Sequence, residues 1–109
     1  MSSNVQRIRA LNDAFRTSLD GGRLMMTAGI DALDSDVKAT IIHKVATFSD
    51  FNPDNDPHGE HDFGAIEVDG LKVFWKIDAY DLTITYGSED PANPDVTTRV
   101  MTIMLADEY

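Results

Sequence analysis

The chain has 109 residues, no cysteine and a formal net charge of −10 at pH 7. This length predicts a single domain over residues 1–109, with one hydrophobic core. The absence of cysteine excludes disulfides, thiolate zinc sites, iron–sulfur clusters and cysteine nucleophiles. No apolar run is long enough to span a membrane and no signal peptide is recognisable, so we expect no membrane contact and a cytoplasmic location.

The charge is divided unevenly along the chain. Residues 1–49 carry six basic and five acidic side chains, whereas residues 50–109 carry three basic and fourteen acidic ones. The C-terminal half repels phosphate backbones, so direct binding of nucleic acid is not expected. It attracts a basic protein surface. Solubility alone also explains an excess of acid, and both interpretations stay open.

The first predicted helix begins at Ser3, which forms a capping box with Gln6, and ends at Gly21-Gly22 in a left-handed conformation. Arg9 and Arg16 fall outside its apolar face and are expected in solvent. The apolar face recurs at spacings of three and four and comprises Val5, Ile8, Leu11, Phe15 and Leu19.

A short apolar run at Arg23–Ala28 predicts a strand, and Gly29–Leu33 predicts a turn. Asp34 or Ser35 then caps a second helix, which must end before Pro53. Its predicted buried stripe is Val37, Ile41, Ile42, Val45 and Phe48.

The segment Phe63–Asp78 predicts a hairpin, because Asp69-Gly70 is a strong signal for a two-residue type I′ turn. In that register Glu67 faces Lys72, an attractive cross-strand pair. The opposite face is predicted to be buried and carries Ile66, Val68, Leu71, Val73, Trp75 and Ile77.

Alternation at Leu82–Tyr86 predicts a further strand, and Gly87–Asp95 has the composition of a loop. The segment after Asp95 suits a helix by its spacing, but its density of Val, Thr and Ile favours a central strand at Thr98–Leu105. The predicted fold is α+β, with two helices packed on one face of a mostly antiparallel sheet of about five strands.

The loop Asp50–Asp62, with the sequence DFNPDNDPHGEHD, is the predicted site. Extending the hairpin register into this loop brings His61 opposite Asp78 as a carboxylate–imidazole pair. Such a pair suits a general base, a metal ligand with its supporting carboxylate, or a structural pin. The candidate polar site comprises Asp56, His58, Glu60, His61, Asp62 and Asp78.

Metal binding at this loop is an alternative hypothesis. Asp54, Asp56, His58 and Gly59 imitate the start of a calcium loop, but the twelfth position is Ala65, which offers no carboxylate. His58 and His61 have a spacing that suits a transition metal, although HxxH in a loop is a weak signal.

No motif for nucleotide binding or for a serine nucleophile is present, and no cofactor is predicted. A structural interpretation of the loop is equally available. In it Asp54, Asp56 and Asp62 accept hydrogen bonds from backbone N–H groups, and Gly59 supplies a positive φ.

Several motifs together resemble a small bacterial protein family of unknown function. They are LNDAFR at Leu11–Arg16, TAGI at Thr27–Ile30, NDPHGEHDFG at Asn55–Gly64, VFWKID at Val73–Asp78 and TTRVMTIMLADEY at Thr97–Tyr109. The resemblance implies occurrence on proteobacterial chromosomes, plasmids and phages, which suits a mobile-element accessory or anti-defence role. It implies no reaction, cofactor or catalytic residue.

Two functions follow as hypotheses. The first is a non-catalytic interaction module that binds a basic protein partner through the acidic half of the chain. The alternative is a small metal-dependent or acid–base hydrolase centred on residues 54–62, with His58 and His61 as its metal ligands if it holds one. The first is favoured, because catalysis needs a cleft that excludes water. The sequence leaves the oligomeric state open.

Overall fold

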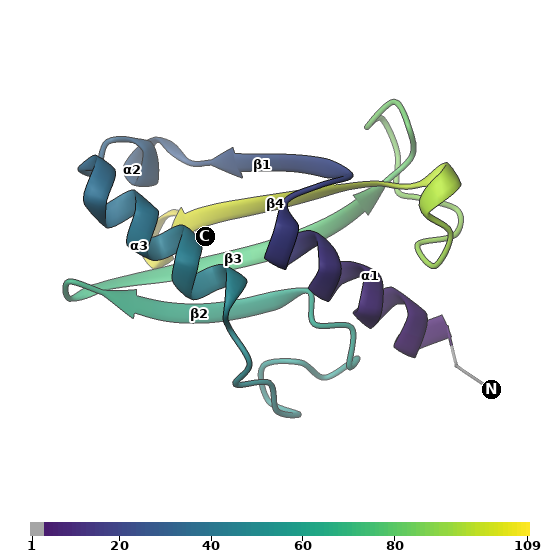
Figure 1. Ribbon diagram of the computed structural model, residues 1–109, viewed down its shortest axis with the longest axis horizontal. Helices are drawn as coiled ribbons and strands as arrows, with labels where there is room; N and C mark the ends of the chain where they lie inside the picture. Colours follow the sequence, from purple (N-terminus) through teal and green to yellow (C-terminus); the bar gives the residue numbers. More distant parts are fainter. Residues whose placement is uncertain (1–3) are drawn as a thin grey trace.

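The structure is a computed structural model and describes residues 4–109, so the predicted capping residue Ser3 lies outside the described residues. Four strands form one mixed sheet in the order β1-β4-β3-β2 (Figure 1). Strand β1 pairs in parallel with β4, and the other two pairings are antiparallel. The strands are β1 (Gly22–Met26), β2 (Phe63–Val68), β3 (Leu71–Tyr80) and β4 (Thr98–Leu105).

Three α-helices accompany the sheet within residues 4–109, and two of them, α1 and α3, lie over the same sheet face (Figure 1). The α+β class is therefore confirmed; residues 4–109 form three α-helices and a mixed sheet of four strands, where two helices and a mostly antiparallel sheet of about five strands were predicted. The helices are α1 (Asn4–Ser18), α2 (Ala28–Asp31) and α3 (Ser35–Ala46), with 3₁₀ turns η1 (Pro94–Val96) and η2 (Ala106–Glu108). No helix among the described residues is long and apolar enough to cross a membrane.

The hairpin β2–β3 has the predicted register. Val68 pairs with Leu71, and Glu67 pairs with Lys72. Asp69 and Gly70 have φ values of 52° and 78°, as the two-residue turn requires. The two-residue turn places the apolar side chains of both strands on the same face of the hairpin. A slip of one residue would turn Trp75 out of the core, so this register is strongly favoured.

Strand β4 is the central strand that its composition predicts. It lies between β1 and β3, and five of its eight residues are buried with side chains on both faces of the sheet. Parallel pairing of β1 with β4 was not predicted. It requires a crossover, and α2 and α3 lie in the chain between these strands.

The predicted strand at Leu82–Tyr86 is wrong. The Asp81 carboxylate accepts hydrogen bonds from the Thr83 hydroxyl at 3.0 Å and from the Thr85 N–H at 3.0 Å. These local bonds replace a strand ladder and turn the chain, and Ile84 takes a left-handed φ of 57°.

Two smaller predictions also need correction. Helix α1 already ends at Ser18 and is followed by the left-handed residue Leu19, with φ 62°; Gly21 is left-handed as predicted, with φ 85°, but Gly22 belongs to β1. The expected turn at Gly29–Leu33 contains most of α2. The first turn of helix α2 is stabilised by the Glu108 carboxylate, which accepts hydrogen bonds from the Thr27 hydroxyl at 2.6 Å and the Gly29 N–H at 3.0 Å.

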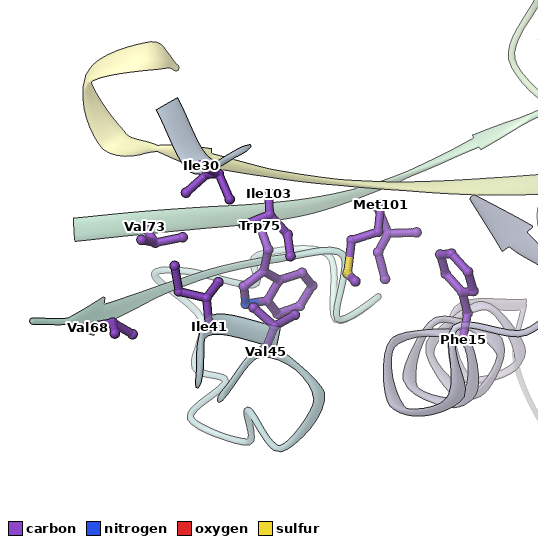
Figure 2. Packing of buried hydrophobic residues seen from close by; sticks show 10 residues of the cluster. Phe15, Ile30, Ile41, Val45, Val68, Val73, Trp75, Met101 and Ile103 are labelled. Carbon is purple, nitrogen blue, oxygen red and sulfur yellow. The ribbon is translucent and has the colours of Figure 1, made fainter. Parts of the chain in front are cut away.

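The core lies between the sheet and the two longer helices, with Trp75 at its centre (Figure 2). The Trp75 ring is fully buried and lies against Gly64 on the neighbouring strand. A Cβ at Gly64 would come within 2.5 Å of the indole nitrogen, so this position has no room for a larger residue. Other buried members of the core are Phe15, Ile30, Ile41, Val45, Val68, Val73, Ile77, Met101 and Ile103.

Candidate functional site

One face of α1 is polar and packs against the central loop. Arg9 donates from Nε to the Gly59 carbonyl at 2.6 Å, and Asn12 donates from Nδ2 to the Glu60 carbonyl at 2.9 Å. The expectation that Arg9 and Arg16 lie in solvent is therefore wrong. Positions 9, 12, 13 and 16 share one helix face, and this polar face joins α1 to the loop.

The Arg16 side chain is almost fully buried and stabilises the end of α3. From Nη1 it donates to the carbonyls of Val45, Ala46 and Phe48 at 2.9, 3.2 and 3.0 Å. From Nη2 it donates to the Asp13 carboxylate at 2.8 Å. A cation at the C-terminal end of a helix satisfies carbonyls that have no partner within the helix and is favoured by the helix dipole.

His61 is held between two carboxylates and an aromatic ring. Its Nδ1 lies 2.9 and 3.0 Å from the two oxygens of Asp13, and its Nε2 lies 3.6 Å from Asp56 Oδ2. The imidazole stacks on Phe51 with ring centres 3.7 Å apart and planes within 2°. The backbone N–H of His61 also donates to Asp56 Oδ1 at 3.1 Å. These contacts leave the ring little freedom to reorient.

The predicted pairing of His61 with Asp78 is wrong in its partner. The β2–β3 pairing ends at Phe63 and Lys76, with one further bond from the Ile77 N–H to the Asp62 carbonyl at 2.8 Å, and His61 takes a φ of 55° just before it. That left-handed turn directs the ring toward α1, where Asp13 receives it. The Asp78 carboxylate lies instead 3.2 Å from the ammonium group of Lys76.

The structural interpretation of the loop is correct at two of its positions. Asp56 accepts the bond from the His61 N–H, and Gly59 has a φ of 71°. At Asp54 the bond in the structure is made by the backbone, whose N–H donates to Asn52 Oδ1 at 2.9 Å. Asn52 and Asn55, which were not singled out, supply most of the local turn bonds.

Burial changes the acid strength of the two carboxyl groups beside His61. Burial raises the pKa of Glu60, and the charge of Asp62 raises it further. Burial likewise raises the pKa of Asp62, with a further contribution from Asp56. Both groups hold a proton more readily than free carboxylic acids.

Arg99 connects the central loop to the segment that joins β3 to β4. It is buried and donates from Nε to Asn12 Oδ1 at 2.7 Å and from Nη2 to the Pro91 carbonyl at 2.5 Å. Asn12 thus bonds both Arg99 and the Glu60 carbonyl. Burial lowers the pKa of Arg99, but a guanidinium stays charged at any physiological pH.

His58 lies on the outer side of the loop and is exposed. With Arg9, Phe51, Asp56 and His61 it borders an open hollow of about 390 Å³. Among residues 4–109, no group of three or more histidine or acidic side chains is arranged to hold a metal ion. The ligand pair His58 and His61 is therefore not completed by a third side chain of the described chain.

The site can hold an imidazole rigidly beside a shallow hollow. A carboxylate on Nδ1 fixes the ring orientation, as in general-base pairs, but the Asp56 carboxylate also faces the other ring nitrogen. Sequence reasoning missed Asn12, Asp13, Arg16 and Arg99. The helical spacing of the first three gives a signal, since it places them on one face; Arg99 gives none.

A family model described as "Protein of unknown function (DUF3768)" matches residues 26–108, and the chain belongs to this family. The match includes His61, Asp56 and Glu60, whereas Asp13 and Arg16 lie before it. No curated protein and no solved structure matches the chain.

Proposed function

We propose that this protein is a non-catalytic interaction module that binds a basic surface of a partner protein through its acidic C-terminal half. The observation that carries the proposal is the distribution of charge over the folded surface. Of the fourteen acidic residues after position 49, nine are exposed. Such a surface attracts a cationic partner and accelerates its encounter.

The basic residues of this half do little to offset the negative charge. Arg99 is buried and bonded to Asn12 and the Pro91 carbonyl, and Lys76 is paired with Asp78. Only Lys72 is both basic and exposed in residues 50–109. The exposed charged residues of this half, nine acidic and one lysine, therefore keep the strong negative excess that the residue count predicts.

The geometry of His61 is consistent with a structural role. Its ring contacts Asp13, Asp56 and Phe51, so it holds α1 against the loop. Substituting His61 is then expected to loosen this contact without removing the acidic surface. Binding of a basic partner should survive His61→Ala.

The proposal is tested with a fluorescently labelled peptide of alternating lysine and serine, followed by anisotropy over a salt series. We expect binding at low salt that weakens by about tenfold between about 50 and about 300 mM NaCl, because salt screens exposed charges. A peptide of alternating glutamate and serine is the matched control and should not bind. Absence of lysine–serine binding at low salt would contradict the proposal.

A second candidate is an acid–base hydrolase centred on the same loop. The observation that favours it is the carboxylate on His61 Nδ1 together with the hollow of about 390 Å³ beside the ring. This function requires that His61→Ala abolish a hydrolytic activity while the circular dichroism spectrum stays unchanged. It also requires that the lysine–serine peptide, whether or not it binds, leave the hydrolytic activity unchanged.

A role as an accessory or anti-defence factor of a mobile element is one setting for such a module. It follows from the family resemblance and stays a prediction. A basic protein that handles nucleic acid is a suitable partner class, because its binding surface is complementary in charge to this one.

A further inference from the structure

We propose that the partner docks on the segment joining β3 to β4, and that it inserts an apolar side chain flanked by lysine or arginine. This inference rests on the proposed function and names its binding surface. The 81–96 surface is defined here by the side chains of Asp81, Leu82, Tyr86, Glu89 and Val96, which border one hollow of about 440 Å³. It lies beyond one end of the sheet, apart from the His61 loop (Figure 1).

Three large apolar side chains are exposed on this surface. Leu82 is 63 % exposed, Tyr86 is 74 % exposed and Val96 is 40 % exposed. A single exposed apolar residue needs no explanation, but three around one hollow form a patch. Tyrosine in particular is enriched among the residues that dominate binding energy at protein interfaces.

The chain around this patch carries charge of one sign only. Residues 81–96 contain four acidic side chains and no basic one. Glu89, Asp90 and Asp95 are exposed. An apolar centre with a charged rim is the usual plan of a protein interface, and here the rim selects a cationic partner.

The same charge argues against the other occupants of an apolar patch. Two copies of a chain with net charge −10 repel each other, and this patch is surrounded by acid in both. A phosphate backbone or an acidic peptide is repelled for the same reason. A basic segment with an apolar anchor is the occupant that satisfies both the hollow and its rim.

The segment is ordered before any partner arrives. The Asp81 carboxylate binds the Thr83 hydroxyl and the Thr85 N–H, and the Thr97 hydroxyl donates to the Asp90 carbonyl at 2.9 Å. Arg99 holds the Pro91 carbonyl from inside, and Ala92 is buried. A surface that is already fixed loses less entropy on binding than a mobile loop does.

The backbone of the segment also explains which side chains are left outside. Ile84 takes a φ of 57°, a rare conformation for a β-branched residue, and is only partly exposed. It borders a different hollow, with Met25, Tyr80 and Val100 of the sheet. Ile84 therefore anchors the turn to the sheet, while Leu82 and Tyr86 on either side of it remain exposed.

The test compares two labelled peptides of equal length and equal lysine content, one alternating lysine with leucine and one alternating lysine with serine. Wild-type protein should bind the leucine peptide about tenfold more tightly, since one well-seated apolar anchor contributes that much. The double substitution Leu82→Ser with Tyr86→Ser should remove this difference, because it takes away the apolar centre of the surface and none of its charge.

A pair of charge-matched variants locates the electrostatic part of binding. Glu89→Gln, Asp90→Asn and Asp95→Asn together should weaken binding of both peptides by about tenfold at low salt. The control set Asp50→Asn, Asp54→Asn and Glu67→Gln removes the same charge from exposed positions elsewhere and should have a much smaller effect. Thermal unfolding of each variant establishes that the fold is retained.

The outcomes separate the inference from the proposed function. Equal weakening by the two charge sets, or a leucine preference that survives the loss of Leu82 and Tyr86, would overturn the docking surface while leaving a diffuse acidic module. If neither peptide binds wild-type protein at low salt, the proposed function itself fails.

Discussion

Replacing Arg16 with methionine is expected to destabilise the fold more than any other single change to the polar face of α1. Methionine has a similar length and fills the same space, but it lacks the guanidinium that lies over the Phe51 and Trp75 rings at 5.4 and 5.1 Å. It removes the donors to Val45, Ala46 and Phe48 at the end of α3. It also removes the ion pair with Asp13.

The cost can be derived from these contacts. Breaking a buried charged contact by removing one partner costs about 3–5 kcal/mol. Asp13 is partly solvated, with 39 % of its side chain exposed, and keeps its contact with His61, so the loss should fall near the lower limit of about 3 kcal/mol. Arg16→Lys keeps the charge but loses the planar fork, and should lie between methionine and wild type.

Urea unfolding followed by circular dichroism measures the free energy of unfolding of these variants. The matched control is Arg7→Met on the exposed side of α1, which should change it by less than about 0.5 kcal/mol. If Arg16→Met were as stable as the Arg7 variant, the buried arginine would not be what joins α1 to the end of α3.

Three further predictions test the packing and the site. Gly64→Ala should cost about 1–3 kcal/mol in urea unfolding because its methyl group would collide with the Trp75 ring, whereas Gly87→Ala, with no atom within 4 Å of the new carbon, should be nearly neutral. Because burial raises the pKa of Glu60 above its ordinary value of 4.5, its stabilising contribution is present below that value and is lost as pH rises through the raised pKa. Glu60→Gln should therefore reduce the fall in stability on the alkaline side of pH 4.5, as measured by urea unfolding at a series of pH values. His61→Asn should increase amide hydrogen exchange in residues 51–61 by removing the contact with Asp13, whereas His43→Asn on the exposed side of α3 should have no effect there.

The parts of the fold that follow from local pattern were predictable. The register of β2 with β3 depends on alternation and on one turn, and both are visible in neighbouring residues such as Val68 and Leu71. The central position of β4 follows from its apolar residues on both faces. Leu82–Tyr86 has the same alternation, but the Asp81 carboxylate competes for its backbone, and alternation alone does not show that competition.

The parts that depend on distant contacts were not predictable from pattern. Arg16 resembles a solvated helix residue until the end of α3 supplies carbonyls for it. A carboxylate partner for His61 was expected from the sequence. Its identity was missed because a left-handed residue at His61 itself ends the hairpin register and turns the ring toward Asp13. The left-handed φ of His61 thus determines that its ring contacts Asp13 and not Asp78.

A basic partner is expected to bind the 81–96 surface and not the hollow beside His61. Amide chemical shifts of isotope-labelled full chain, recorded while the lysine–leucine peptide is added, test this most directly. Saturable shift changes are expected at residues 81–96, with the amides of residues 51–61 nearly unchanged. Changes concentrated at residues 51–61 would contradict it and would favour a binding or catalytic site at His61.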